Sequence, residues 1–264
     1  MRAFTGLFIK ELKLSKNLFL LSLLAMFIIV LLAVGLQRYF HEPQIFAVIT
    51  LTIFFMHVFF MPAFLFNSLK TEAQTQLWMH NPNSGSKLFL AKLSSCAFYF
   101  LFSIVIALIL AVWGINQAIL PEVLATDSPL AQPMSNLLFS GFIIFFMSVF
   151  LGIWVLFFWT FYHALKNIPI IRNLRWPIMI GIWLLLSFVE NYVTNLPIYQ
   201  KMIRIGTIKI DSIPFIRFET GAHSFTAGVH DAAGLSIMNC IIYLVIIVIV
   251  FICAVWLLER KVEV

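Results

Sequence analysis

Six apolar stretches, each long enough to cross a lipid bilayer, constrain the fold of this chain more than any other feature. They cover residues 18–36, 45–66, 93–115, 137–161, 176–193 and 236–258. A bilayer core of about 30 Å is crossed by about 20 helical residues. In lipid the backbone must hydrogen-bond within its own segment or close into a barrel, and these stretches lack the alternation of barrel strands. The sequence therefore predicts an all-α integral membrane protein with six transmembrane helices.

The composition supports a membrane location and argues against nucleic-acid binding. Of 264 residues, 62% are hydrophobic and 11% are charged, which leaves too little polar surface to cover a soluble globule. The formal charge of +6 follows the loops instead of forming one patch, so we expect contacts with membrane lipids and none with nucleic acid. No internal repeat or soluble domain is visible, and we expect a single transmembrane domain over residues 1–264.

Lysine and arginine are distributed unevenly among the loops. Four precede the first span, three lie in residues 69–92 and three lie between the fourth and fifth spans, whereas the loop after the third span has none. The positive-inside bias therefore predicts a multi-pass protein of the cell membrane with both termini and residues 69–92 in the cytoplasm. The loop 195–234 then falls outside despite its four basic residues, because the alternative would make the fifth span re-entrant.

The loop 195–234 is too long for a simple turn and is expected to carry structure or function. Within it, residues 208–219 partly alternate apolar and polar side chains, which weakly predicts a strand or a hairpin bent around Pro214.

The residues before the first span form an amphipathic pattern. Over residues 3–16, Lys10 and Lys13 share the polar arc of a helical wheel, which predicts a helix lying in the cytoplasmic interface. Glu11 breaks the pattern because it falls within the apolar arc. Its carboxylate either reaches water or pairs locally with Lys10 or Ser15, or it pairs with a partner chain.

Residues 69–92, the polar segment, interrupt the apolar sequence between the second and third spans. Its first part, residues 69–77, carries a thin apolar stripe that suits a short helix on the membrane surface. Pro82 disfavours helical geometry at the residue before it, so a turn is expected there. The polar segment is therefore predicted to form a short transverse helix, a sharp turn and the start of a new span.

The helix that follows this turn has two features at its start. Ser84 or Ser86 can cap its first turn. Lys87 and Lys92 are then expected at the level of the lipid headgroups, with their aliphatic stems along apolar surface.

The sequence offers no catalytic machinery. The stretch NPNSGSK lacks the first glycine of a phosphate-binding loop and has its lysine in the wrong register. An intramembrane enzyme needs paired acids, a serine with a histidine, or a metal-ligand cluster, whereas the spans contain almost no ionisable group other than His57 and Glu190. We therefore expect no enzyme activity, no metal and no cofactor in this chain, and any work it does must be driven by a partner.

Ionisable and aromatic residues within the spans give a candidate path for a substrate. His57 lies in the middle of the second span, where it either bonds to a neighbouring helix or faces a path for cargo. Phe55, Phe59, Phe146 and Trp154 are candidates for the same path, since inward-facing aromatic rings suit an apolar or amphipathic cargo. The alternative is that these rings contact lipid or pack between helices.

Small residues and one proline predict how the helices bend and pack. Pro62 is expected to kink the second span near its cytoplasmic end. Ala107 with Ala111, and Ser148 with Gly152, are pairs of small residues four positions apart that permit close approach of another helix.

These residues resemble ABC-2-type transporter permeases. The opening LFIKELKLSKNLFLLSLL is similar to their N-terminal interfacial helix and first span, and the tail WLLERKVEV to those of Firmicute members. The polar segment carries residues similar to those of the loop between their second and third spans, namely Glu72, Leu77, Pro82, Ser86 and Lys92. The chain departs from the family at Asn83, where a more apolar residue is usual, and in its basic outer loop.

The resemblance implies a type V exporter-like bundle with six spans, an N-terminal interfacial helix and a separate motor. Such a permease dimerises with itself or with a paralogue and rests on two ATPase subunits, which hold the ATP and Mg²⁺. Residues 69–86 would be the coupling segment that seats in a groove of the ATPase and passes its closure to the spans. The residues implied in this contact are Glu72, Gln76, Leu77, Trp78, Pro82 and Ser86.

Three functions are compatible with these observations. The first is the transmembrane subunit of an ATP-driven exporter that moves, or confers resistance to, an amphipathic or hydrophobic substrate such as an antimicrobial peptide or a lipid. The second is a sensor or scaffold that does not transport and whose basic outer loop binds a peptide or an anionic polymer. The third is an intramembrane enzyme, which the missing catalytic groups disfavour.

Overall fold

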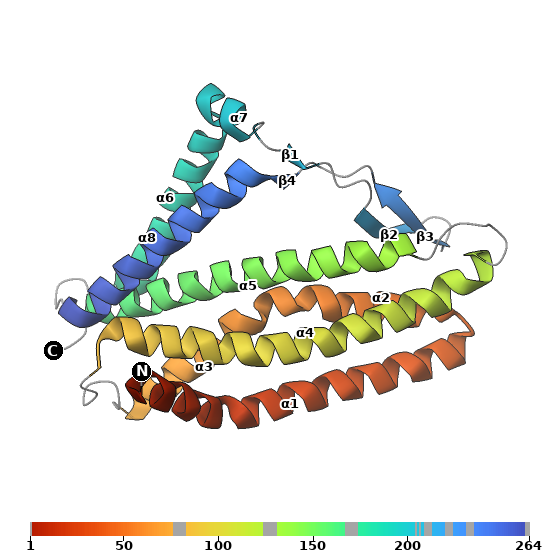
Figure 1. Ribbon diagram of the computed structural model, residues 1–264, viewed down its shortest axis with the longest axis horizontal. Helices are drawn as coiled ribbons and strands as arrows, with labels where there is room; N and C mark the ends of the chain where they lie inside the picture. Colours follow the sequence, from red (N-terminus) through yellow and green to blue (C-terminus); the bar gives the residue numbers. More distant parts are fainter. Residues whose placement is uncertain are drawn as a thin grey trace. The chain divides into compact units, whose positions relative to one another are not determined.

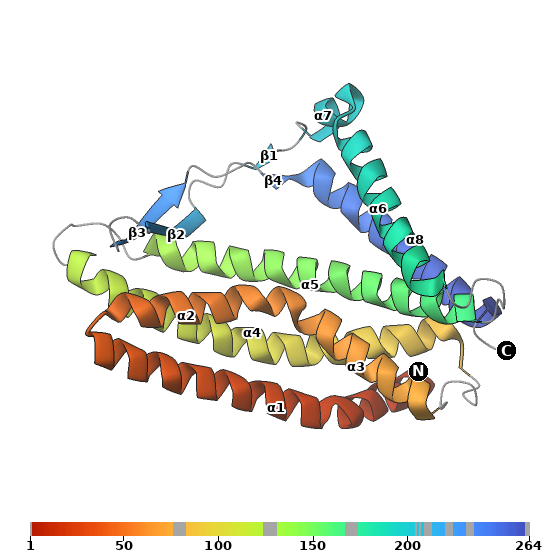
Figure 2. The same ribbon diagram turned by 180° about the vertical axis from the view of Figure 1, so that it is seen from behind.

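The computed structural model describes residues 2–75, 83–123, 131–166, 174–203, 205, 207–208, 213–219, 224–230 and 235–261. Within these ranges, six helices are long and apolar enough to cross a membrane (Figures 1 and 2). They cover Phe4–Phe40, Pro43–Gln74, Gly85–Ala118, Leu137–Lys166, Arg175–Thr194 and Ile237–Arg260. Each predicted span lies within one of these helices, except that the last helix begins one residue later. The predicted all-α membrane fold is confirmed, and the protein is a multi-pass membrane protein.

The elements follow one another as labelled in Figure 1. The helices are α1 (Arg2–Phe40), α2 (Pro43–Met56), the 3-10 helix η1 (His57–Phe59), α3 (Phe60–Thr75), α4 (Gly85–Val123), α5 (Ala131–Lys166), α6 (Arg175–Thr194), α7 (Pro197–Ile203) and α8 (Ile237–Lys261). Short strands lie between α7 and α8, namely β1 (Thr207–Ile208), β2 (Ile213–Glu219), β3 (Ser224–His230) and β4 (Leu235–Ser236).

The chain packs into two compact units. Unit 1 comprises Met1–Ser68, Ala91–Gly152 and Ser212–His230, and unit 2 comprises Leu69–Leu90, Ile153–Asp211 and Asp231–Val264. Helices α1 and α2 therefore belong to unit 1, and α6, α7 and α8 belong to unit 2. Helices α3, α4 and α5 each contribute residues to both units.

Helix α1 runs without a break from Arg2 to Phe40. The sequence predicted an interfacial helix over residues 3–16 and a separate span, and the residues between them are also helical. Asn17 lies at this junction, but asparagine is only a mild helix breaker and neither proline nor glycine adjoins it. The helix ends before His41, which takes a positive φ of 58°, and Glu42 is extended ahead of the proline that begins α2.

The second span is interrupted at membrane depth. It changes from α-helix to one 3-10 turn at His57–Phe59 and then resumes as α3, and the bend between α2 and α3 is visible in Figure 2. The cause is Pro62, whose missing N–H and bulky ring disturb the turn before it. The backbone N–H of Met61 instead donates to Ser148 Oγ on α5 at 3.2 Å. The predicted kink is therefore present, and it begins one turn before the proline.

Small residues bring the helices of unit 1 close together, as predicted. Ala107, Ala111 and Ser148 are fully buried. A side chain on Gly152 would place its Cβ 2.8 Å from Leu65 Cδ1 on α3, which is closer than real Cβ contacts. The approach is closer at Gly114 on α4 than at Gly152, because a Cβ on Gly114 would collide with Thr50 Oγ1 on α2.

The outer loop contains paired strands. β2 pairs antiparallel with β3, and Pro214 lies within β2 opposite Val229. Of the two alternatives predicted for residues 208–219, the strand is therefore present as β2, whereas a hairpin bent around Pro214 is not, because the proline lies inside the strand and is paired with β3. In unit 2, β1 pairs antiparallel with β4 and joins the ends of α7 and α8.

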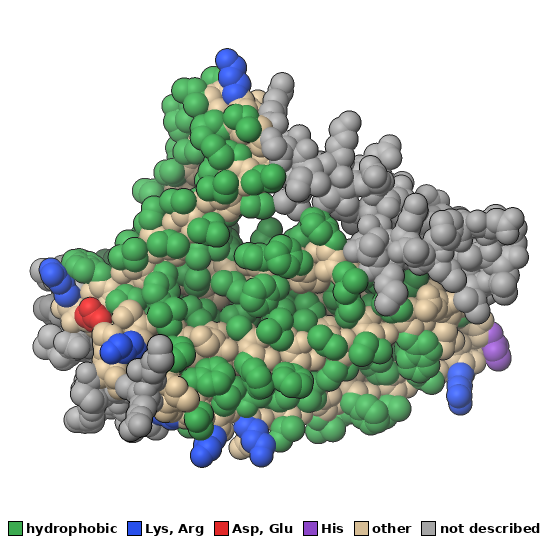
Figure 3. Space-filling model, in the orientation of Figure 1, with side chains coloured by type: hydrophobic (Ala, Val, Ile, Leu, Met, Phe, Trp, Pro, Cys, Tyr) green, Lys and Arg blue, Asp and Glu red, His purple; other side chains and the backbone are tan. Residues whose placement is uncertain are grey.

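Large apolar side chains are exposed along several helices, as expected for lipid contact. Figure 3 shows hydrophobic side chains over most of the visible surface of the described helices. On α1, Leu21 and Leu32 are each 61% exposed. No residue of α6 is buried, so most of the surface of this helix is open to lipid or to another chain. The interior of the chain is formed mainly by α2, α3, α4 and α5.

Candidate functional site

The polar segment is the first candidate site, and the structure describes its two arms. Residues 69–75 continue α3 without a break, so the predicted separate transverse helix does not begin there. The reason is local, since the sequence LKTEAQT holds good helix formers and no glycine or proline. Gln76, Leu77, Trp78 and Pro82 lie outside the described residues.

The acidic residue that the family resemblance assigned to the coupling contact is buried. Glu72 lies on α3 and is only 5% exposed, so its carboxylate is not presented on the surface of the chain. Ser86 lies in the first turn of α4, and its Oγ is 3.1 Å from Ser84 Oγ. Ser84 lies immediately before α4, and its backbone carbonyl accepts a hydrogen bond from the backbone N–H of Lys87 at 3.0 Å. Of the two serines predicted as caps, Ser84 is therefore the N-cap residue.

A carboxylate on α8 caps the N-terminus of α4. Glu259 Oε1 accepts a hydrogen bond from the backbone N–H of Gly85 at 2.9 Å. A negative group at a helix N-terminus satisfies a free N–H and complements the helix dipole. A Cβ on Gly85 would lie 3.1 Å from Leu258 Cδ2, so the absence of a side chain permits this close approach. Glu259 was not identified from sequence, where its only signal is an acid beside basic residues after the last span.

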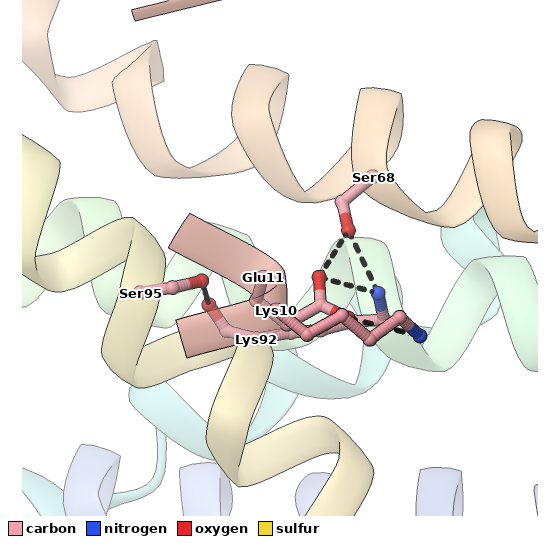
Figure 4. A network of polar contacts seen from close by, with 5 residues as sticks. All are labelled: Lys10, Glu11, Ser68, Lys92 and Ser95. Atoms are coloured by element: carbon pink, nitrogen blue, oxygen red, sulfur yellow. Dashed lines mark hydrogen bonds and ion pairs between the residues drawn. The ribbon is translucent and has the colours of Figure 1, made fainter. Parts of the chain in front are cut away.

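The second arm of the polar segment ends in a buried ion pair, drawn in Figure 4. Lys92 Nζ on α4 lies 2.9 Å from Glu11 Oε2 on α1, and Ser68 Oγ on α3 donates to the same oxygen at 3.0 Å. Lys92 Nζ also donates to Ser68 Oγ at 2.7 Å. The relative exposure is 2% for Glu11, 1% for Lys92 and 8% for Ser68. We name these three residues the Glu11 clamp.

The Glu11 clamp corrects two predictions. Glu11 was expected to reach water, to pair locally with Lys10 or Ser15, or to pair with a partner chain. The local contact with Lys10 is present at 3.9 Å, but the carboxylate is buried and its closer partner is Lys92 of the same chain, which was not predicted. Lys92 was expected at the lipid headgroups, but it is buried and paired with Glu11. Lys13 and Lys87 are exposed, as their predicted positions require. A lysine within the apolar run LAKLSSCAF was the signal available in the sequence.

Further contacts hold α1 against α4 beside the clamp. Tyr99 Oη donates to the backbone carbonyl of Leu12 at 2.7 Å, and the Tyr99 ring stacks on Phe19 with centroids 4.5 Å apart. Ser95 Oγ donates to the carbonyl of Lys92 at 2.9 Å. The N-terminal turns of α1 are therefore fixed to α4 by a row of polar and aromatic contacts within unit 1.

His57 forms a second buried polar centre in unit 1. Its Nδ1 lies 2.8 Å from the carbonyl oxygen of Ile53, and its Nε2 lies 2.9 Å from Ser103 Oγ on α4. The imidazole stacks on Phe60 at a centroid distance of 5.8 Å with rings nearly parallel. Of the two interpretations from sequence, the structure shows the histidine bonded to a neighbouring helix. Ser103, its partner, was not identified from sequence.

The aromatic candidates for a cargo path do not surround His57. Phe55, Phe59 and Phe146 are 47%, 58% and 45% exposed, whereas His57 is 7% exposed. Trp154 lies in the part of α5 that belongs to unit 2, where it stacks on Phe158 with centroids 5.5 Å apart. The rings that contact the histidine are Phe60 and Phe100.

Replacing His57 with leucine is expected to lower the free energy of unfolding by about 1–2 kcal/mol, because the hydrogen bond between α2–α3 and α4 is lost. Chemical unfolding in detergent micelles measures the change. The matched control is Phe55→Leu at an exposed position of the same span, which should change stability by less than about 0.5 kcal/mol. Equal unfolding curves for the two variants would contradict a stabilising role for the contact with Ser103.

Unit 2 contains a polar cleft that was not predicted from sequence. It has a volume of about 370 Å³ and is lined by Thr194, Tyr199, Gln200, Ile203, Asn239 and Tyr243. Two of its groups bond to each other, since Tyr199 Oη donates to Asn239 Oδ1 at 2.7 Å. At its side, Tyr243 Oη donates to Glu190 Oε1 at 3.2 Å. These bonds join α7 to α8 and α6 to α8.

The potential metal ligands and the cysteines are dispersed over the described part of the chain. Among those residues no three of His, Cys, Asp and Glu lie close enough to hold a metal ion. Cys96 is a buried free cysteine on α4, while Cys240 and Cys253 are exposed on the apolar helix α8.

Comparison with known proteins gives one full-length likeness. The chain is similar to the uncharacterized protein YhcE of Bacillus subtilis (strain 168), with 28% identity over 269 residues that cover 100% of both chains. No protein-family model matches the chain. No solved structure matches it. The likeness supports a fold shared over the whole length and assigns no activity.

Proposed function

We propose that this chain is the permease subunit of an ABC-2-type transporter, which exports an amphipathic or hydrophobic substrate such as a peptide or a lipid. A separate ATPase subunit supplies the energy. The observation that carries the proposal is the construction of the polar segment: both of its arms are continuous with long helices, and both are held by buried or capping carboxylates, Glu11 and Glu259.

The lengths of these helices support a protruding segment. The second span runs for 32 residues and the third for 34, whereas about 20 suffice to cross the bilayer core. On the side of the polar segment, the helices continue past the predicted spans over residues 67–74 and 85–92. At 1.5 Å per residue, each of these extensions is about 12 Å long. A rigid helical extension of this kind can transmit a movement of a bound partner to the membrane-spanning helices.

The contacts also support a location of both chain ends and the polar segment on the same side of the membrane. In unit 1, Glu11 near the start of α1 bonds to residues that flank the polar segment, and in unit 2, Glu259 near the end of α8 bonds to Gly85 within it. The six candidate spans among the described residues, an even number, agree with this arrangement. The basic residues around these parts favour the cytoplasmic side, where an ATPase would meet them.

Two ATPase subunits and a second permease copy, or a paralogue, would complete the transporter. The exposed apolar faces of α1 and α6 offer surface for lipid and for such a second copy. ATP and Mg²⁺ would bind the ATPase subunits, because the sequence of this chain has no phosphate-binding loop.

Capture of an ATPase tests the proposal. Chain purified from its own host membrane in mild detergent is expected to bring down an ATP-hydrolysing subunit. The variant L77D/W78D is expected to lose about a hundredfold in capture, because charge at an apolar hot spot costs about 2–4 kcal/mol. The control I198D, placed on α7 at the other end of the spans, should capture normally. An ATPase that binds L77D/W78D as well as wild type, or no ATPase at all, would contradict the proposal.

A further inference from the structure

The Glu11 clamp is an unusual way to hold three membrane helices together. A buried ion pair contributes little net stability compared with apolar residues of the same volume, because both charges lose their hydration. Ionisable residues within membrane helices are costly and mark functional positions. The packing of α1, α3 and α4 could be achieved by leucine and methionine alone, so the clamp calls for another explanation.

The position of the clamp in the chain supplies that explanation. Ser68 is the residue immediately before the polar segment, and Lys92 is its last residue. Both donate hydrogen bonds to the same oxygen, Glu11 Oε2, at 3.0 and 2.9 Å. One carboxylate on α1 therefore fastens the two points at which the chain enters and leaves the polar segment.

We propose that Glu11 is a positioning residue for energy transmission, an inference that rests on the proposed function. By holding both flanks of the polar segment, it makes the N-terminal turns of α1 move with α3 and α4 when an ATPase displaces that segment. The contacts of Tyr99 with Leu12 and Phe19 extend this attachment along α1. Displacement of the polar segment would then move the first span together with the second and third spans. The polar segment is covalently joined only to the second and third spans, so the first span depends on the Glu11 clamp for this movement.

Variants can separate this role from simple packing. E11L/K92M removes both charges together and keeps apolar volume, so the protein is expected to fold and to capture its ATPase. E11D/K92R keeps a pair of opposite charges. Ser68→Ala detaches only α3 and is the smallest change. K13M is the control, because it removes a cation of α1 that is exposed and outside the clamp.

The first measurement is the nucleotide response of the complex. A single cysteine at Ile198, which is 71% exposed on α7, is labelled with a water-soluble thiol reagent in a cysteine-free background. In wild type and K13M, vanadate trapping should change the labelling rate about fivefold or more. E11L/K92M should hydrolyse ATP with no such change, S68A should show a reduced change, and E11D/K92R should restore part of it. An unchanged response in both E11L/K92M and S68A would overturn the proposal.

The second measurement uses the chain without any ATPase. Spin labels at Lys13 on α1 and Ile109 on α4, both exposed positions of unit 1, report how firmly the two helices are joined. The distance distribution should be narrow in wild type and wider in E11L/K92M and S68A. Equal widths would overturn the clamp even if an ATPase binds, whereas a widened distribution in a chain that captures no ATPase would reject the proposed function alone.

Discussion

Replacing Glu11 alone with leucine is expected to lower the free energy of unfolding by about 3–5 kcal/mol, because the buried Lys92 then loses the carboxylate that balances its charge. Lys92 is 1% exposed, and its ammonium group donates hydrogen bonds to Glu11 Oε2 and Ser68 Oγ. The double variant E11L/K92M should recover most of this loss, since no charge remains buried. Unfolding in detergent, measured for both single variants and the double variant as a cycle, gives the coupling between the residues.

Lys10 provides the control for this cycle. Its amino group lies 3.9 Å from the same carboxylate, but its side chain is 34% exposed. An exposed ion pair contributes little, so K10M should cost less than about 1 kcal/mol. If E11L were no more destabilising than K10M, or if the double variant were worse than either single variant, the buried pair could not have the role assigned to it.

Replacing Gly114 with leucine is expected to cost about 1–3 kcal/mol, because α4 and α2 touch at this position. A Cβ there would collide with Thr50 Oγ1 and would lie 3.0 Å from Ala47 Cα, which is backbone and cannot rotate away. Thr50 is itself held by hydrogen bonds to the carbonyls of Phe46 and Ala47 at 2.9 and 3.0 Å. The two helices must therefore separate to admit a side chain.

Gly35 is the control for Gly114, because it lies within the membrane helix α1 and a Cβ there would meet nothing within 4 Å. Gly35→Leu should change the melting temperature in detergent little or raise it, since leucine is the better helix former. A similar loss of stability in both variants would indicate an effect of leucine itself and would contradict close packing at Gly114.

The sequence predicted those features that depend on local pattern. Apolar length alone located the spans, because lipid requires a helix wherever the backbone crosses it. Ala107, Ala111, Ser148 and Gly152 were identified as close-packing residues because small size has the same meaning on any helix in a membrane. Pro62 predicted a kink for a similar reason, since its ring and missing N–H act on the turn just before it.

Features that depend on distant pairing could not be predicted in this way. Glu11 and Lys92 are separated by 81 positions, and nothing in either local sequence identifies the other as its partner. The same holds for Gly85 with Glu259 and for His57 with Ser103. The continuity of α1 was missed for the opposite reason, because a change of polarity around Asn17 was interpreted as a boundary although the backbone had no cause to break there.

The cap that Glu259 places on α4 sets an order for biosynthesis. Its partner Gly85 is made 174 residues earlier, which at 5–20 residues per second corresponds to roughly ten to thirty seconds of translation. During that time the start of α4 is without this carboxylate, because Glu259 has not yet been synthesised. The cap on α4 is therefore completed only after α8 has been made.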